Sequence, residues 1–348
     1  MQSATRRAVL FGGTGVLGRA IARRLLNEGW AVDLVGRDRS HVPNDLLIKG
    51  GRFHAADRSD DVALGHIVGS GADLLVDALC YTANHARQLI PLLRDVTSAV
   101  MLSSKAVYVD EEGRHANSRG TPQFSFPIRE DQPTVEPGNS DFNSREGYGA
   151  NKVAAERTLL DSGLPVTVIR ASKVHGDGAP APLEWHFVKR VLDRRPAVFL
   201  AHQGLGANHT TAAANLAALV ERVAAVPGQR ILNSADPDAP NGLQIARTIA
   251  AYLGHEWEEI LLEENSSDLG RHPWDAHPPI ILDTRASLQL GYVPAGTYAE
   301  TVTTEIDWLL EQDRIGSGDE IHRPSPSDYA AEDEYLVRRA GLASSRRK

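Results

Sequence analysis

The chain has 348 residues and a formal net charge of −8 at pH 7; 42% of its residues are hydrophobic and 24% are charged. This length can bury a sizeable core, so we expect one large domain or two lobes. The acidic charge disfavours a general nucleic-acid-binding surface, and no apolar run approaches the roughly 20 residues of a membrane helix. A single cysteine, Cys80, rules out an internal disulfide and a Cys-based metal cluster. The composition therefore predicts a cytoplasmic protein that binds neither nucleic acid nor membrane.

A short apolar strand at residues 8–11 runs directly into a glycine turn. Gly12 allows the tight turn, Gly15 lets backbone N–H groups approach a pyrophosphate, and Gly18 lets the following helix pack closely on the strand. The pattern alone is weak evidence, because a strand-to-helix turn without a ligand has the same glycines. The residues expected to contact a dinucleotide here are Gly12, Thr14, Gly15, Val16, Leu17 and Gly18.

Helix-like and strand-like segments then alternate along the chain. Residues 19–28 have helical periodicity, Gly29 supplies a stop, and residues 30–35 read as a strand. Further strand-like runs lie at 73–79, 99–102 and 166–169, with helix-like stretches between them. Such alternation predicts a parallel sheet covered by helices on both faces, the doubly wound Rossmann-type α/β fold.

The end of the second strand bears on the type of dinucleotide. Arg37 lies 19 residues after Gly18, where a guanidinium can bind a 2′-phosphate and stack on adenine. This favours NADP(H) over NAD(H); the alternative is a solvated Arg37, with Asp38 serving the ribose of NAD. Asp57 follows a third expected strand, where its carboxylate reaches the adenine amino group or only forms a turn.

Tyr148 and Lys152 are candidates for the chemistry. They lie four residues apart at the start of a helix expected over residues 148–160, so both side chains share one face. An ammonium group beside a phenol favours phenolate, so we expect Lys152 to lower the pKa of Tyr148 and to make it a general acid or base. Ser104 ends an earlier strand, where it can bind a substrate oxygen or serve turn chemistry only.

Together these motifs resemble the extended short-chain dehydrogenase/reductase superfamily, in particular its NAD-dependent epimerase/dehydratase family, and the resemblance covers most of the chain. The elements that carry it are Gly12-x-x-Gly15-x-x-Gly18, Ser103-Ser104-Lys-Ala-Val-Tyr108, Pro127-Ile-Arg-Glu-Asp131, Tyr148-Gly-x-x-Lys152 and Val168-Ile-Arg170-Ala-Ser-Lys-Val-His-Gly176. The resemblance implies that Tyr148 exchanges the proton, Lys152 binds the nicotinamide ribose, Ser104 orients the reacting oxygen, and Ala78 and Leu79 line the cofactor. It also implies a homodimer.

Four departures from the family pattern narrow the choice of reaction. Nucleotide-sugar dehydratases carry Asp-Glu where this chain has Lys105-Ala106, so that reaction is disfavoured. Arg37 fits an exchangeable NADPH better than a permanently bound NAD. The 44 residues between Ser104 and Tyr148 exceed the family's usual spacing, so residues 110–146 are predicted to form an active-site flap or insertion. His175 stands where the family often has tyrosine.

The predicted organisation is an NAD(P)-binding Rossmann domain at 1–180, a smaller C-terminal substrate lobe mainly at 181–312 that partly returns to the Rossmann core, and a tail at 313–348. Lys105, His175 and Trp185 are the candidate substrate contacts. The basic residues that follow Trp185 suit a diphosphate or, more commonly, a solvated face. No metal site is predicted, because the spacing of the C-terminal histidines matches no ligand pattern. Residues 315–328 read as a mobile stretch, and 329–342 as a short helix that docks on this subunit or on a partner.

These features predict an NAD(P)-dependent oxidoreductase that acts on a ketone or secondary alcohol of a small sugar-like or natural-product substrate. One alternative is a nucleotide-sugar epimerase with tightly bound NAD. Another is a cofactor-binding scaffold or regulator that performs no chemistry, although Ser104, Tyr148 and Lys152 argue against it.

Overall fold

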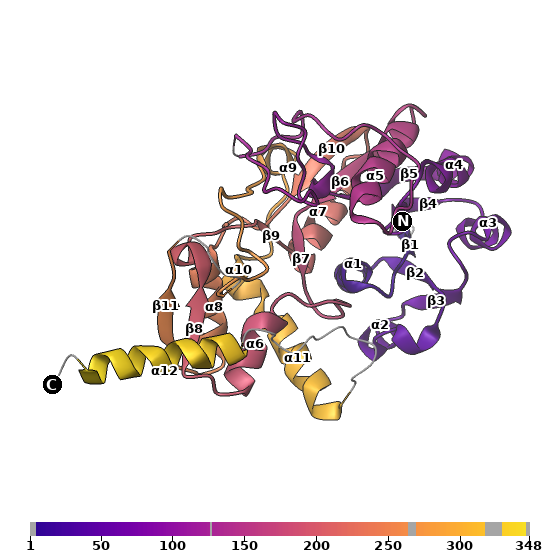
Figure 1. The fold of residues 1–348 in the computed structure, drawn as a ribbon. Helices are drawn as coiled ribbons and strands as arrows, with labels where there is room; N and C mark the ends of the chain where they lie inside the picture. Colours follow the sequence, from indigo (N-terminus) through magenta and orange to yellow (C-terminus); the bar gives the residue numbers. More distant parts are fainter. Residues whose placement is uncertain (1–4, 126, 264–268, 317–328, 346–348) are drawn as a thin grey trace.

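A computed structural model describes residues 5–125, 127–263, 269–316 and 329–345 (Figure 1). Its centre is a seven-stranded parallel sheet with the strand order β10-β6-β5-β4-β1-β2-β3. The strands are β1 (Arg7–Phe11), β2 (Ala31–Gly36), β3 (Arg52–Ala55), β4 (Ala72–Asp77), β5 (Val96–Ser104), β6 (Val166–Ala171) and β10 (Arg230–Ser234). The chain reverses its direction of winding between β3 and β4, which lie on opposite sides of β1. This confirms the predicted doubly wound Rossmann-type fold.

Helices cover both faces of the sheet because the strands are apolar on both sides. Ala8 and Leu10 of β1 pack in a core with α1 (Val16–Asn27), α2 (Asn44–Ile48) and α7 (Ala213–Ala225). Val9 and Phe11, which point the other way, pack with α3 (Asp61–Val68), α4 (Ala83–Leu89) and α5 (Arg145–Leu160). The period of two within each strand therefore assigns its residues to the two helical layers.

A second group of elements forms a lobe beside the sheet (Figure 1). Its core joins α6 (Trp185–Leu192), α8 (Gly242–Tyr252), α10 (Tyr298–Thr301) and α11 (Thr303–Ile315) around Trp274. Two small parallel sheets, β8 (Ala197–Leu200) with β11 (Glu258–Leu261) and β7 (Lys173–His175) with β9 (Thr210–Ala212), belong to this half. Between lobe segments, α7 and β10 return to the large sheet. The remaining elements are α9 (Arg285–Gln289) and the 3₁₀ turns η1 (Arg39–His41), η2 (Ile90–Asp95), η3 (Lys105–Val107) and η4 (Ala201–Gly204).

The C-terminal helix α12 (Tyr329–Ser345) docks on the lobe of its own chain (Figure 1). Tyr335 and Leu336 pack against Phe199 and Ile260, which belong to β8 and β11. A helix is therefore present where the sequence predicts one. The predicted mobile stretch at 315–328 lies almost entirely outside the described residues. Among the residues that are described, no helix has the length and apolar character needed to cross a membrane.

Candidate active site

The glycine turn that joins β1 to α1 leaves little space for side chains at Gly12 and Gly18. Gly12 has a φ of +81°, which disfavours any side chain. A Cβ on Gly18 would lie 2.3 Å from the carbonyl oxygen of Gly12, so glycine is required for α1 to approach the turn. A Cβ on Gly15 would meet only that same oxygen, at 3.6 Å. Gly15 is the N-cap of α1, where free N–H groups and the helix dipole favour an anion.

A cleft of about 580 Å³ opens beside this turn; we call it the glycine-turn cleft. Of the predicted cofactor residues, Gly12, Thr14, Gly15, Arg37, Asp57 and Leu79 line it. Val16, Leu17, Gly18 and Ala78 do not; Leu17 and Ala78 pack against the core, where they support the turn from behind. The cleft thus follows the carboxyl ends of β1, β2, β3 and β4, the edge where this fold binds ligands.

Three charged residues follow β2 and β3. Local hydrogen bonds hold Asp38 and Asp57, whereas Arg37 is exposed. The carboxylate of Asp38 accepts a hydrogen bond from the backbone N–H of Ser40 at 2.8 Å and so caps η1. Asp57 likewise accepts bonds from the backbone and hydroxyl of Ser59, which hold the pKa of its carboxyl below the usual value. Arg37 is exposed and lines the cleft. Asp38 is therefore committed to a turn, whereas Arg37 is exposed at the wall of the cleft.

Ser104, Tyr148 and Lys152 come together next to this cleft. Tyr148 and Lys152 lie on α5, and the Ser104 hydroxyl at the end of β5 is near enough to the Tyr148 phenol to affect its pKa. Ser104 also accepts a hydrogen bond from the N–H of Ala106 at 3.2 Å, so it serves turn chemistry as well. The cleft and this group meet at Tyr81, whose ring lines the cleft and lies 6.4 Å from the Tyr148 ring, centroid to centroid.

The structure differs from the expectation that Lys152 lowers the pKa of Tyr148. Burial raises the pKa of Tyr148 to about 12, against a smaller opposing effect of the Ser104 hydrogen bond. The ammonium of Lys152 lies 5.9 Å from the Tyr148 ring centroid and donates to the carbonyl oxygens of Cys80 and Leu102, both at 2.9 Å. Burial also lowers the pKa of Lys152. In the cofactor-free chain, Tyr148 is accordingly a protonated acid at neutral pH.

Several cleft residues were not predicted from the sequence. Tyr81 stacks on Phe142 with ring centroids 5.3 Å apart, and His85 and Asn143 line the cleft beside them. Tyr81 directly follows the Ala78-Leu79-Cys80 segment, so extending that match by one residue would have found it. Phe142 belongs to the predicted flap, 110–146, and this end of the segment does border the cleft. Ile128, nearer the middle of the segment, is instead buried against Leu282.

Two of the three predicted substrate contacts lie elsewhere. Trp185 is buried in the core of the lobe with Phe187, because α6 turns its apolar face inward. His175 is buried and binds Asp236, with 3.0 Å between Nε2 and Oδ2. Lys105 lies directly after Ser104, but its ammonium is buried and donates to Ser172 and Asn208. Burial, together with the nearby Lys173, lowers the pKa of Lys105 well below its usual value.

Two of the basic residues that follow Trp185, Arg190 and Arg195, form ion pairs with acidic residues of α12. Arg190 is almost fully buried and pairs with Glu332 of α12 at 2.9 Å. Arg195 pairs with Glu332 and with Asp333 of the same helix. These cations thus hold the tail helix, so the expected diphosphate site is not supported at these two residues.

Comparison with known proteins agrees with this fold. The model of the family described as "NAD dependent epimerase/dehydratase family" matches residues 8–205. No curated protein matches the chain at a significant level. Among solved structures, UDP-glucose 4-epimerase of Thermotoga maritima, determined with UDP-glucose, has a TM-score of 0.64 at 17% identity over 88% of this chain and 99% of its own. UDP-N-acetylglucosamine 4-epimerase of Methanobrevibacter ruminantium has a TM-score of 0.68 at 15% identity, with coverages of 89% and 100%. dTDP-glucose 4,6-dehydratase of Bacillus anthracis, in complex with NAD, has a TM-score of 0.65 at 14% identity, with coverages of 89% and 98%.

Proposed function

Because the chain belongs to the NAD-dependent epimerase/dehydratase family, we propose that it transfers a hydride between a nicotinamide cofactor and a ketone or secondary alcohol. One observation carries the proposal: the Tyr148 phenol lies near Ser104 and Lys152, and its ring is 6.4 Å from that of Tyr81, which lines the glycine-turn cleft. A proton donor and a hydroxyl positioned together suit a reaction in which a carbonyl oxygen gains a proton while its carbon gains a hydride.

In the reducing direction the protein's own groups have distinct tasks. The Tyr148 phenol, whose pKa is raised to about 12 by burial, gives its proton to the substrate oxygen. The Ser104 hydroxyl donates to the same oxygen and orients it. The Lys152 ammonium, held by two carbonyl groups, is positioned to exchange one of them for the hydroxyls of a nicotinamide ribose. The cofactor supplies the hydride when bound.

We further propose that the cofactor is NADP(H) and that it exchanges with solution, with NAD(H) as the alternative. Arg37 supports this choice because it lines the cleft and can pair with a 2′-phosphate. The competing acceptor for the ribose of NAD, Asp38, is already bonded to the N–H of Ser40. Asp57 is placed to meet the adenine amino group.

The substrate is proposed to be a small sugar-like or natural-product molecule with an anionic group. Lys105 and Lys173 follow the ends of β5 and β6, the two strands that carry Ser104 and Ala171 side by side. Among the residues that the structure describes, neither lysine is hydrogen-bonded to a carboxylate, although the charge of Glu184 opposes the lowering of the Lys173 pKa by burial. A carboxylate or phosphate on the substrate would therefore offset their burial.

A nucleotide-sugar epimerase is the second candidate, favoured by the similarity to UDP-glucose and UDP-N-acetylglucosamine 4-epimerases. Such an enzyme keeps its nucleotide through the reaction. The proposal predicts the opposite behaviour, so the nucleotide content of the purified protein separates the two candidates.

The test measures nucleotide retained after purification, then binding and oxidation of NADPH and NADH with a panel of ketones that carry an acidic group. We expect no retained nucleotide, tighter binding of NADPH, and turnover that Tyr148→Phe lowers by about 10²- to 10⁴-fold while NADPH still binds. Tyr252→Phe, on the exposed side of α8, is the matched control. Tightly retained NAD would favour the epimerase. Binding of neither nucleotide would contradict both reactions and favour a scaffold.

A further inference from the structure

Three buried side chains converge between the large sheet and the lobe, away from the glycine-turn cleft. His175 is the last residue of β7, Glu184 directly precedes α6, and Glu305 lies on α11. Each exposes 1% of its surface or less. One ligand atom from each, a ring nitrogen or a carboxylate oxygen, lies within 4.8 Å of the other two. Burying two carboxyl groups so close together is costly unless something positive lies between them.

In each of these side chains, one polar atom has a hydrogen-bond partner in the described chain and the other polar atom has none. Glu305 Oε2 accepts a hydrogen bond from the N–H of Gly176 at 2.6 Å, and the Tyr298 hydroxyl donates to Glu184 Oε1 at 3.4 Å. By contrast, Glu305 Oε1, Glu184 Oε2 and His175 Nδ1 are buried without a hydrogen-bond partner in the described chain. Buried polar atoms are nearly always partnered, so this cluster needs either a proton shared by the two carboxyl groups, whose pKa values burial raises, or a positively charged ligand.

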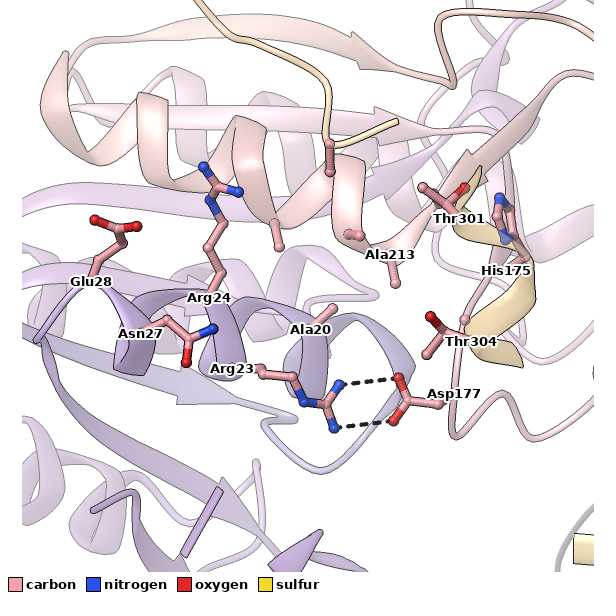
Figure 2. A pocket seen from close by; sticks show the side chains of 15 residues that line it. Ala20, Arg23, Arg24, Asn27, Glu28, His175, Asp177, Ala213, Thr301 and Thr304 are labelled. Atoms are coloured by element: carbon pink, nitrogen blue, oxygen red, sulfur yellow. Dashed lines mark hydrogen bonds and ion pairs between the residues drawn. The ribbon is translucent and has the colours of Figure 1, made fainter. Parts of the chain in front are cut away.

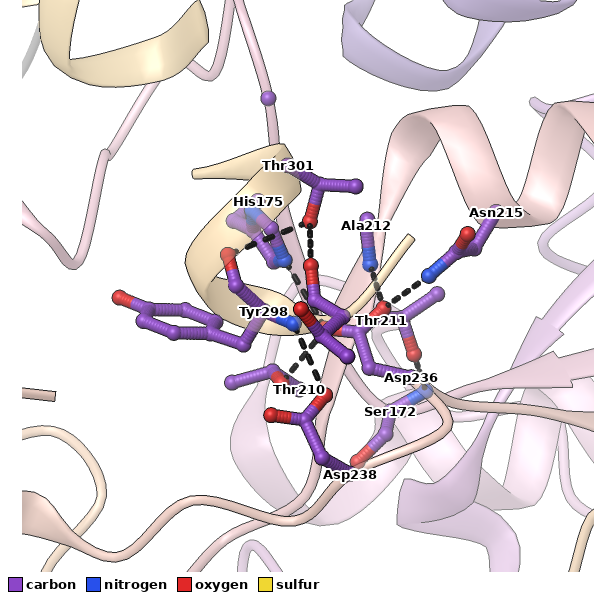
Figure 3. A network of polar contacts seen from close by, with 12 residues as sticks. Ser172, His175, Thr210, Thr211, Ala212, Asn215, Asp236, Asp238, Tyr298 and Thr301 are labelled. Atoms are coloured by element: carbon purple, nitrogen blue, oxygen red, sulfur yellow. Dashed lines mark hydrogen bonds and ion pairs between the residues drawn. The ribbon is translucent and has the colours of Figure 1, made fainter. Parts of the chain in front are cut away.

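The ring orientation of His175 follows from its neighbour Asp236 (Figure 3). Asp236 already accepts bonds from the Thr210 hydroxyl, the N–H of Ala212 and the amide of Asn215, at 2.6 to 2.8 Å. With its oxygens occupied as acceptors, Asp236 accepts a hydrogen bond from Nε2–H of His175, at 3.0 Å. This contact raises the pKa of His175 against the effect of burial, and Nδ1 carries a lone pair when the ring is neutral. A carboxylate that orients the far nitrogen of an imidazole is the usual support for a metal-binding histidine.

We propose that His175 Nδ1, Glu184 and Glu305 bind a divalent transition-metal ion of the zinc or manganese class. One ligand atom of each side chain lies within 4.8 Å of the other two, so a small inward movement of the three side chains would bring them to the 2.0–2.2 Å of Zn–N and Zn–O bonds. One imidazole and two carboxylates suit zinc or manganese better than calcium, which takes oxygen ligands.

A cavity reaches the cluster at His175, the one of its three side chains that lines the cavity. This cavity of about 300 Å³ is lined by His175, Asp177, Thr301 and Thr304, and the Arg23–Asp177 ion pair stands within it (Figure 2). Water in this cavity can complete the coordination. The ion would tie α6 and α11 of the lobe to β7, which joins the end of the large sheet. We therefore assign it a structural role, separate from hydride transfer.

The test uses the full chain stripped of metal by a chelator and then given zinc or manganese. We expect one equivalent to bind, with a rise in the thermal unfolding midpoint, and an anomalous-scattering peak among the three side chains in crystals of the wild-type chain. Glu305→Gln and Glu184→Gln should each weaken binding at least tenfold. Glu311→Gln, an exposed ion-paired glutamate on the same helix, should bind as the wild type does.

The alternative is a proton shared by the two carboxyl groups, and the same experiment distinguishes it. An amide at Glu305 can donate to the bare oxygen of Glu184, so the metal-free Glu305→Gln variant should fold as well as the metal-free wild type. If the stripped wild type binds neither ion at millimolar concentration, or if both glutamine variants bind as tightly as the wild type, the proposal is wrong.

Discussion

The ammonium of Lys152 lies 4.3 Å from the centroid of the Tyr81 ring, closer than it lies to the ring of Tyr148. It donates to two carbonyl groups at the ends of neighbouring strands, so without a cofactor it acts on the backbone rather than on the phenol. Burial then leaves the pKa of Tyr148 at about 12. The four-residue spacing of Tyr148 and Lys152 is therefore necessary for the proposed chemistry, but the cofactor must complete the arrangement.

This pKa predicts a different pH profile for each direction of the proposed reaction. Ketone reduction needs the phenol, which is the dominant form below pH 12, so kcat/KM should be flat between pH 6 and 9. Alcohol oxidation needs the phenolate, whose fraction rises about tenfold per pH unit below the pKa. Initial rates at saturating cofactor measure both profiles. Because bound oxidised nicotinamide is positively charged and lowers the pKa of Tyr148, the oxidation profile should level off below pH 12. A reduction rate that rises with pH would contradict Tyr148 as the proton donor.

Arg37→Ser should change cofactor preference without damaging the cleft. The loss of a charge-assisted contact with a 2′-phosphate corresponds to about 1.5–3 kcal/mol, so the Kd for NADPH should rise about 10- to 100-fold. The Kd for NADH should change less than about threefold, because NADH has no 2′-phosphate. Fluorescence titration gives both values. Arg39→Ser is the control, since Arg39 lies two residues further along in η1 and does not line the cleft. An equal rise in the Kd values for NADPH and NADH would show that Arg37 does not bind the 2′-phosphate.

Phe142→Ala tests whether the end of the 110–146 segment closes on bound cofactor. The substitution removes the ring that stacks on Tyr81 at 5.3 Å, an aromatic contact of about 0.5–1.5 kcal/mol, and opens one wall of the cleft. We expect nucleotide affinity to fall about 3- to 10-fold with little change in the thermal midpoint, because Phe142 is only half-buried. Phe142→Leu should lose less. If the affinity is unchanged in both variants, the segment does not contribute to binding.

The parts of the fold and site that could be predicted are those encoded locally. Glycine spacing places the turn at Gly12 to Gly18, and a four-residue helical spacing places Tyr148 beside Lys152. The failures concern contacts between distant segments. Nothing near Trp185 tells whether its helix faces a ligand or the core of the lobe. The pairing of Arg190 with Glu332 joins residues 142 positions apart, and the cluster of His175 and Glu305 depends on how α11 packs. Such contacts depend on tertiary packing, which a single sequence does not display.

Glu332→Gln should release the tail helix α12 from the lobe. Glu332 is fully buried and pairs with Arg190 and Arg195, each at 2.9 Å, so the neutral amide leaves two cations without their shared counter-charge. Removing one partner of a buried ion pair costs about 3–5 kcal/mol. Detaching α12 lets both cations reach water, at the cost of exposing the contact of Tyr335 and Leu336 with Phe199. Amide hydrogen exchange in α12 should therefore become faster by about 100-fold or more, while exchange in β1 and β4 stays slow.

Glu334→Gln is the matched control on the same helix, because Glu334 is exposed and lies 3.7 Å from Arg338. Equal exchange rates in the two variants would show that the ion pairs of Glu332 do not hold α12 on the lobe.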